Sequence, residues 1–185
     1  MIQKVTALYE YYSKEDWLFL PNGKVVNPQE FCHALKDWDL TKLVNVDWAV
    51  NIGKNILKML PKDFLKDKII VPIPGGSRIT TFLPTIFSLE QHCSIITPFV
   101  KTGGDSLYKQ KKDNKETAQI PIECRFQPKP KNLLFFDDVV ATGSTIRRCA
   151  ELLDEDTEIS VFTLTIDSET FVKHNPDIKW SILTK

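Results

Sequence analysis

The chain has 185 residues, of which 42% are hydrophobic and 26% are charged, and its 24 basic and 24 acidic side chains give a formal net charge of zero. This composition excludes intrinsic disorder and low-complexity sequence. It is typical of one globular domain that is large enough to bury a core without disulfides or metals. Because the net charge is zero, binding to nucleic acid is unsupported, and any site for a polyanion must be local.

The chain is expected to be cytoplasmic and to have no membrane partner. Its N-terminus lacks the uninterrupted apolar stretch of a signal peptide, and no apolar run approaches the length of a membrane span. The four cysteines, at positions 32, 93, 124 and 149, include no C-x-x-C pair. Reduced thiols are therefore expected, and neither a disulfide framework nor a zinc ribbon is indicated.

Residues 1–60 are predicted to form a small cap, or hood, on the main body of the protein. Asn22 and Gly23 stand between two apolar runs, which indicates a β-hairpin over residues 16–26. Apolar residues recur at helical spacing over residues 28–60. The aromatic side chains of this segment provide either a stacking face for a base or ordinary core packing, which is the commoner role. These aromatic residues are Trp17, Phe19, Phe31, Trp38 and Trp48.

Residues 61–185 are predicted to form the core of the same compact domain, an α/β structure with a parallel sheet flanked by helices. Short apolar runs alternate with helical stretches from residue 68 onward, which is typical of parallel sheets. Ligands of such sheets bind beyond the carboxyl ends of the strands, so the turns after residues 73, 99 and 136 are expected to carry the site. Residues 167–185 receive no role. The predicted strands cover residues 69–73, 94–99, 132–136 and 159–166, and the predicted helices cover residues 79–92 and 144–153.

The stretch from Leu133 to Thr145 contains the most informative motif. Four apolar residues precede Asp137 and Asp138, and a short apolar step then leads to Ala-Thr-Gly-Ser-Thr at positions 141–145. Gly143 permits a tight turn, and the backbone N–H groups and hydroxyls of residues 142–145 would form an anion-binding nest at the start of a helix. The two carboxylates upstream would accept hydrogen bonds from sugar hydroxyls. The motif therefore predicts a site for a ribose 5-phosphate.

A structural alternative stays open for this motif, because a strand that ends in solvated acids is often followed by a helix capped by Thr or Ser. The contiguous order of a buried strand, an acidic pair and a hydroxyl-rich turn is more specific than that alternative. Two other phosphate-binding motifs are excluded, since the chain has neither the P-loop pattern G-x-x-x-x-G-K-[ST] nor the dinucleotide pattern G-x-G-x-x-G.

Residues 133–145 resemble the phosphoribosyl pyrophosphate (PRPP) signature of type I phosphoribosyltransferases, and the order of strands and helices over residues 68–166 is similar to that of the family. The resemblance implies a type I phosphoribosyltransferase fold with a hood over the base site, and Mg²⁺-dependent transfer of ribose 5-phosphate from PRPP. By this resemblance Asp137 and Asp138 would hold the ribose hydroxyls. The residues that would hold the 5-phosphate are Ala141, Thr142, Gly143, Ser144 and Thr145.

Two further loops resemble elements of the family. Gly75, Gly76, Ser77 and Arg78 are similar to its pyrophosphate loop, and the arginine suits bidentate contact with a diphosphate; the alternative is a Pro-Gly turn with a surface arginine. Residues 101–116, with five lysines and three acids, correspond to its flexible loop. By the resemblance this loop would close over PRPP and exclude water, with Lys101 as a pyrophosphate contact. A solvated charged loop is the alternative.

The layout is most similar to the competence-protein (ComF-like) branch of the family. This chain departs from that branch at residues 79–84, where Ile-Thr-Thr-Phe-Leu-Pro replaces the usual arginines and Gly-Phe-Asn-Gln stretch, and it lacks the zinc ribbon often found there. Ala141 stands where 6-oxopurine salvage enzymes carry a carboxylate base, so salvage of hypoxanthine or guanine is disfavoured.

The predicted function is that of a Mg²⁺-dependent phosphoribosyltransferase of nucleotide metabolism, in which a base or amine displaces pyrophosphate from PRPP. The sequence does not identify the acceptor. Mg²⁺ is expected to be held mainly by ligand oxygens and water rather than by a protein cage. The alternative is a non-catalytic sensor of PRPP or of a nucleotide on the same fold. The resemblance also implies a homodimer, which nothing in the sequence tests.

Overall fold

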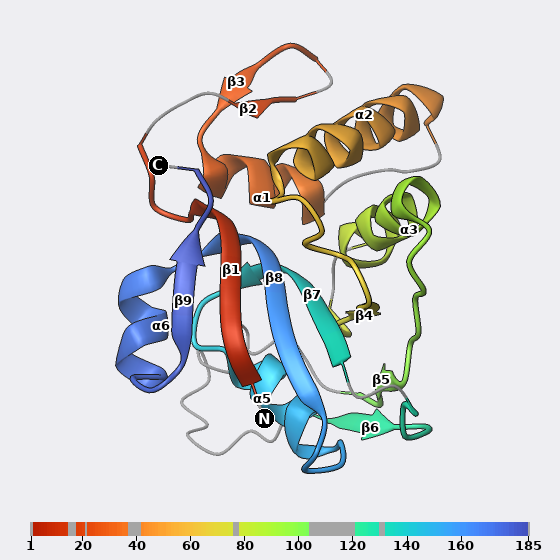
Figure 1. The fold of residues 1–185 in the computed structure, drawn as a ribbon. Helices are drawn as coiled ribbons and strands as arrows, with labels where there is room; N and C mark the ends of the chain where they lie inside the picture. The colour runs from red at the N-terminus through yellow and green to blue at the C-terminus, as the bar shows by residue number, and fades with distance from the viewer. Residues whose placement is uncertain are drawn as a thin grey trace.

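A computed structural model describes residues 2–14, 18–20, 22–36, 42–75, 78–103, 121–129 and 132–184. At its centre lies a sheet of five strands in the order β4-β7-β8-β1-β9, in which every neighbouring pair is parallel (Figure 1). The predicted α/β class with a parallel sheet is therefore confirmed. The strands are β1 (Ile2–Glu10), β4 (Ile69–Pro72), β7 (Asn132–Val140), β8 (Glu158–Ile166) and β9 (Lys179–Ile182).

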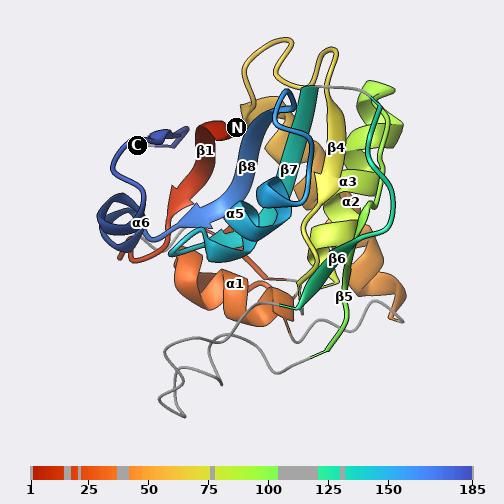
Figure 2. The ribbon, with the colours of Figure 1, turned by 90° about the horizontal axis from the view of Figure 1, so that it is seen from below.

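Helices cover both faces of the sheet (Figure 2). Side chains along β7 alternate between the two faces: Leu134 and Phe136 belong to one core, and Leu133 and Phe135 belong to the other. This alternation is the ordinary geometry of a strand that is buried on both sides. The α1 face is covered by α1 (Pro28–Lys36), α2 (Leu43–Met59) and α3 (Ile79–Gln91), and the α5 face is covered by α5 (Ser144–Glu151) and α6 (Ser168–His174).

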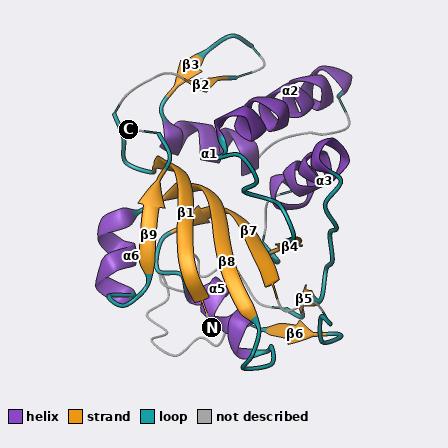
Figure 3. Cartoon of the chain, viewed as in Figure 1, coloured by secondary structure: helices purple, strands orange, loops and turns teal. Residues whose placement is uncertain are grey.

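Two small antiparallel ribbons accompany the sheet (Figure 3). β2 (Leu18–Phe19) and β3 (Val25–Val26) form the hairpin that the Asn-Gly turn predicts. β5 (Phe99–Lys101) pairs with β6 (Ile122–Cys124), and the Phe99 ring lies 5.7 Å from the Phe135 ring on the α5 face. In the described part of the chain no helix combines the length and apolar character that crossing a membrane requires.

The N-terminal segment corrects the predicted boundary at residue 60. β1 lies inside the sheet between β8 and β9, and it pairs in parallel with β8 from Ile2 to Glu10. Val5, Ala7 and Leu8 are each at most 1% exposed. Residues 1–60 are therefore not a cap that is separate from the core formed by residues 61–185. Among the described residues, the cap consists of the β2–β3 hairpin, α1 and α2.

Three of the four predicted strands are present as β4, β7 and β8, and the two predicted helices are present as α3 and α5. The strand predicted over residues 94–99 is largely wrong. Only Ile95 bridges to the sheet, opposite Ile70, and the chain then leaves to form β5. Pro98 explains the departure, because proline has no N–H to donate to a continued ladder.

Candidate functional site

The turn between β7 and α5 has the geometry that the motif predicts. Gly143 adopts a left-handed conformation, with φ 68°, directly before α5 begins at Ser144. A Cβ atom at this position would lie 3.3 Å from the Phe171 ring, so both conformation and space favour glycine. The hydroxyls of Thr142 and Ser144 are hydrogen-bonded to each other at 2.7 Å. The Ser144 N–H donates to the Thr142 hydroxyl at 3.4 Å. The first N–H groups of a helix have no partner within the helix, which favours an anion at this turn.

An open cavity of about 390 Å³ adjoins the turn, and we call it the nest cavity. It is lined by Asp137, residues 139–146 and His174. The structure thus brings His174, from the end of α6, to the motif, although sequence reasoning gave this histidine no role. The motif residues that line the cavity beside Asp137 are Ala141, Thr142, Gly143, Ser144 and Thr145.

Asn175 fixes the turn from the side of α6, and sequence reasoning missed it. Its side chain is buried, and its amide nitrogen donates hydrogen bonds to the carbonyl oxygens of Thr142, at 3.1 Å, and Phe171, at 2.8 Å. Its amide oxygen accepts a hydrogen bond from the guanidinium of Arg147 on α5. Because these partners come from three separate segments, no local signal in the sequence could have identified the contact.

The acidic pair of the motif divides between the two faces of the sheet. Asp137 lies towards α5, where burial raises the pKa of the Cys149 thiol and the charge of Asp137 raises it further. Asp138 lies towards α1, where burial raises the pKa of the Tyr11 hydroxyl and the charge of Asp138 adds to that rise. Adjacent side chains of a strand point in opposite directions. The two carboxylates therefore approach any ligand from different sides of β7.

Asp138 has an oxygen without a partner. Its side chain is 8% exposed, and Oδ1 accepts a hydrogen bond from the Val139 N–H at 2.9 Å. Among the residues that the structure describes, Oδ2 of Asp138 is the single buried side-chain oxygen or nitrogen atom that lacks a hydrogen-bond partner. Burying a carboxylate oxygen without a donor costs free energy, so a ligand that supplied a donor here would be favoured.

Polar groups from β8, from α1 and from the turn after β1 lie on the same side as Asp138. The hydroxyl of Thr165 donates to the Asp138 carbonyl oxygen at 3.4 Å, and the Cys32 sulfur lies 3.3 Å from that hydroxyl. The Tyr11 hydroxyl lies 3.4 Å from Nε2 of His33. Two hydroxyls, a thiol and an imidazole thus lie where α1 of the cap meets the carboxyl ends of β1 and β8.

The predicted pyrophosphate loop follows β4 beside the motif. Ile73 donates a backbone hydrogen bond to the carbonyl of Phe136 on β7 at 2.9 Å, so the loop starts next to the acidic pair. Gly75 and Arg78 are exposed. Gly76 and Ser77 lie outside the described residues.

Lys101 is exposed at the end of β5, in the ribbon with β6. Of the described residues, neither Lys101 nor Arg78 lines the nest cavity. Residues 104–120, which include most of the predicted flexible loop, lie outside the described residues. The contacts of these groups with a diphosphate therefore stay predictions.

The aromatic residues of the cap differ in burial: Phe31 belongs to the core, whereas Phe19 is exposed. Phe31 is buried and packs against Trp48, with 5.7 Å between the ring centroids. The indole N–H of Trp48 donates to the Phe19 carbonyl at 3.0 Å. These three residues help to line an apolar pocket of about 340 Å³ between β1, the hairpin, α1 and α2. Trp17 and Trp38 lie outside the described residues. Core packing is thus confirmed for Phe31, and a stacking face for a base stays a prediction.

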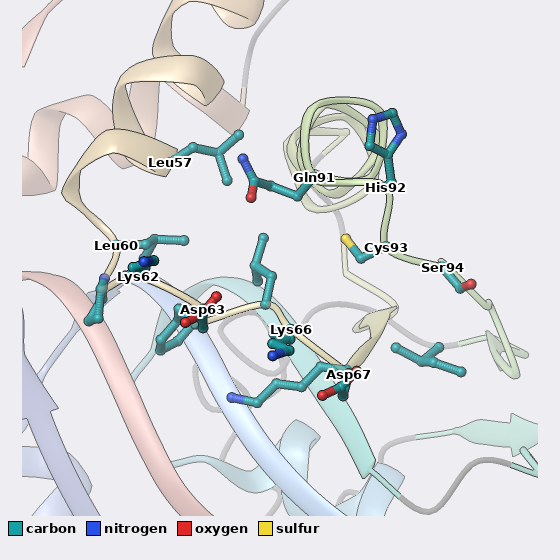
Figure 4. Close-up of a pocket in the computed structure, with 15 residues that line it drawn as sticks. Leu57, Leu60, Lys62, Asp63, Lys66, Asp67, Gln91, His92, Cys93 and Ser94 are labelled. Atoms are coloured by element: carbon teal, nitrogen blue, oxygen red, sulfur yellow. The ribbon is translucent and has the colours of Figure 1, made fainter.

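A larger cavity, of about 760 Å³, lies before β4, between the end of α2 and the end of α3 (Figure 4). Its charged lining residues include Lys62, Lys66 and Lys68, which alternate with Asp63 and Asp67. This cavity adjoins the amino end of β4, whereas ligands of open parallel sheets bind beyond the carboxyl ends. We therefore place the candidate site at the nest cavity.

No protein-family model matches this chain, and no curated protein sequence matches it either.

Proposed function

We propose that the chain is a phosphoribosyltransferase that transfers ribose 5-phosphate from PRPP to a nitrogen of a base or amine and releases pyrophosphate. The observation that carries this proposal is the continuous unit formed by residues 132–151. A buried strand delivers Asp137, the left-handed Gly143 turns the chain, and α5 begins at a cavity of about 390 Å³. Cavities of this size accommodate small ligands.

The 5-phosphate would bind at residues 141–145. The N–H groups at the start of α5 supply donors, and the helix dipole favours negative charge at this end. The hydroxyls of Thr142 and Ser144 lie 2.7 Å apart, so one phosphate group could accept hydrogen bonds from both. Asn175 holds the Thr142 carbonyl at 3.1 Å, which keeps the turn in place before the ligand arrives.

The ribose hydroxyls would bind the acidic pair. Asp137 lines the nest cavity, beside the phosphate position. Asp138 contributes Oδ2, which has no partner among the described residues and would accept a hydrogen bond from a sugar hydroxyl. Because the carboxylates lie on different faces, the sugar would sit across the end of β7, with its departing group and its acceptor on the side of the cap.

The carboxylate oxygens at the site suit Mg²⁺, because this ion prefers oxygen ligands and keeps several of its waters. The carboxylates of Asp137 and Asp138 would hold the hydrated ion through the ribose hydroxyls and water. When bound, Mg²⁺ would neutralise the charge of a departing diphosphate. Arg78 and Lys101 are proposed as further diphosphate contacts, together with Gly75, Gly76 and Ser77. We propose Asp137, Asp138 and Lys101 as the catalytic residues of the transfer.

A sensor of PRPP or of a nucleotide is the second candidate, because one observation favours it. The described lining of the nest cavity contains no lysine or arginine that could hold a departing diphosphate. A protein with this lining would bind the phosphate and ribose and report occupancy to a partner without transferring the sugar.

The proposal is tested by calorimetric titration with PRPP, with and without Mg²⁺, followed by an assay of pyrophosphate release against a panel of bases and amines. Saturable Mg²⁺-dependent binding and pyrophosphate release with one acceptor are expected. Binding without release from any acceptor would favour the sensor. Absence of PRPP binding would refute the transferase and the PRPP sensor.

Variants locate the bound ligand. Asp137→Asn combined with Asp138→Asn is expected to weaken PRPP binding at least tenfold, and Gly143→Val is expected to abolish it, because a branched side chain is strained at φ 68° and meets Phe171. Asp154→Asn, at an exposed acid in the loop before β8, is the matched control. Equal affinity in all variants would show that the ligand binds elsewhere.

A further inference from the structure

His174 is the last residue of α6. It lines the nest cavity together with residues 141–145 of the motif. It is exposed to solvent. The chain contains three histidines, and the other two, His33 and His92, are not among the described residues that line this cavity. His174 therefore lines the same cavity as the turn at which the proposed function places a phosphate.

The hydrogen bond of His174 within α6 determines which ring nitrogen carries a proton. Nδ1 lies 2.8 Å from the carbonyl oxygen of Thr170. A carbonyl oxygen can only accept, so Nδ1 is the donor and carries a hydrogen. In the neutral ring Nε2 then has a lone pair and no hydrogen. That nitrogen would repel a phosphate oxygen, unless the ring takes up a second proton.

The end of α6 is anchored against the turn. Arg147 of α5 donates a hydrogen bond to the His174 carbonyl oxygen at 3.3 Å, and the next residue, Asn175, holds the Thr142 carbonyl. The backbone that carries the imidazole is thus tied to the nest itself. Among the described residues, three charged groups belong to the elements that meet at His174. They are Asp137 of β7, which lines the same cavity, Arg147 of α5, which donates to the His174 carbonyl, and Lys173 of α6.

We propose that His174 binds the phosphate of the ligand as an imidazolium, and that it takes up one proton from solvent on Nε2 as the ligand enters. The inference rests on the proposed function, because it requires a phosphate in the nest cavity. The charge of a phosphate dianion stabilises the added proton, and Nε2–H then donates a charge-assisted hydrogen bond. His174 would thereby make phosphate binding dependent on pH, with affinity falling as the pH rises.

The test is calorimetric titration with ribose 5-phosphate at pH 8, with EDTA to exclude metal. At this pH the phosphate monoester is already doubly ionised, since its second pKa is about 6, so the ligand itself takes up no proton. The heat of binding is measured in buffers of different ionisation enthalpy, which yields the number of protons taken up. The wild-type protein is expected to take up as much as one proton for each ligand bound.

Two variants separate the charge of the ring from its titration. His174→Ala is expected to bind ribose 5-phosphate about tenfold more weakly and to take up no proton. His174→Lys keeps a cation that needs no added proton, so it is expected to bind within about threefold of wild type, also without proton uptake. His92→Gln, at an exposed histidine beyond the end of α3, is the matched control and should keep both affinity and uptake.

Unchanged affinity and proton uptake in His174→Ala would overturn the role of His174. Weak binding by His174→Lys, with folding confirmed by circular dichroism, would overturn the requirement for a cation. If wild type binds PRPP but not ribose 5-phosphate, this inference fails and the proposed function stands. If it binds neither, both fail.

Discussion

The Asp138 carboxylate combines burial with an unpartnered oxygen, Oδ2, in the described part of the chain. Such a group lowers the stability of the folded state, because the oxygen loses its bonds to water and gains none from protein. Asp137, the neighbouring acid, lines the nest cavity and takes part in interactions with its surroundings. Asp138 is thus the member of the pair whose burial is not compensated by the protein.

Replacing Asp138 by Asn is therefore expected to raise the free energy of unfolding by about 1 kcal/mol while PRPP binding weakens, because the neutral amide is less costly to bury than a carboxylate. Denaturant titration of wild type and variant measures the change. Asp137→Asn is the control, and it should give no such gain. A loss of stability in Asp138→Asn would mean that this carboxylate is a structural group.

Tyr9 gives a prediction about alkaline pH. Its side chain is 5% exposed, and burial raises the pKa of its hydroxyl to about 12. Because the folded state holds this proton more tightly than the unfolded state, Tyr9 lowers stability as the pH rises from about 10 to about 12. The loss expected is about 2–3 kcal/mol. Urea denaturation at pH 9 and pH 11.5 should show a smaller fall in Tyr9→Phe, and an equal fall would exclude ionisation of Tyr9 as the cause.

At the scale of elements, the contact between α2 and α3 depends on one glycine. Gly53 is buried in the middle of α2, and a Cβ atom there would lie 2.9 Å from Cγ2 of Ile86 on α3. That carbon is attached directly to Cβ of a branched side chain, so it cannot move away by changing a distant torsion. The two helices therefore approach as closely as they do because position 53 has no side chain.

In an exposed helix position Gly→Ala stabilises a protein by about 1 kcal/mol, because alanine favours the helix. Gly53→Ala is expected to reverse that sign and to cost about 1–3 kcal/mol through overpacking. Thermal denaturation measures the change. Asn55→Ala, at an exposed position of the same helix, is the control and should be neutral or stabilising. Stabilisation by Gly53→Ala would show that α2 and α3 can separate at little cost.

At the scale of the whole molecule, the N-terminal strand belongs to the core. β1 lies between β8 and β9, so removing it would detach β9 and expose one edge of β8. An exposed edge of this length, with buried apolar side chains on both faces, favours aggregation. The cap and the core are therefore parts of one folding unit.

The fragment 61–185 is accordingly expected to be unfolded or aggregated, as judged by circular dichroism and gel filtration. A point variant tests the same idea in the full chain: Ala7→Asp, at a residue that is 0% exposed, should cost more than about 4 kcal/mol. Phe19→Asp, in the hairpin and 61% exposed, is the matched control and should change stability little. A folded fragment 61–185 would restore the boundary at residue 60.

The sequence by itself determined those parts of the protein that neighbouring residues decide. An apolar run, a glycine and a stretch with helical spacing are enough to predict β7, the turn at Gly143 and α5, because each depends on local conformational preference. The Asn22-Gly23 hairpin is of the same kind. This is why the candidate site could be located before the fold was known.

The tertiary structure alone decided the rest, because the remaining features are contacts between distant segments. The sequence did not predict β1 as a strand of the sheet, because this segment is buried only through its pairing with β8 and β9. The direction of Asp138, away from Asp137, follows from the register and pleat of β7. His174 and Asn175 meet the turn because α6 folds back onto it, and no spacing within residues 167–185 contains that information.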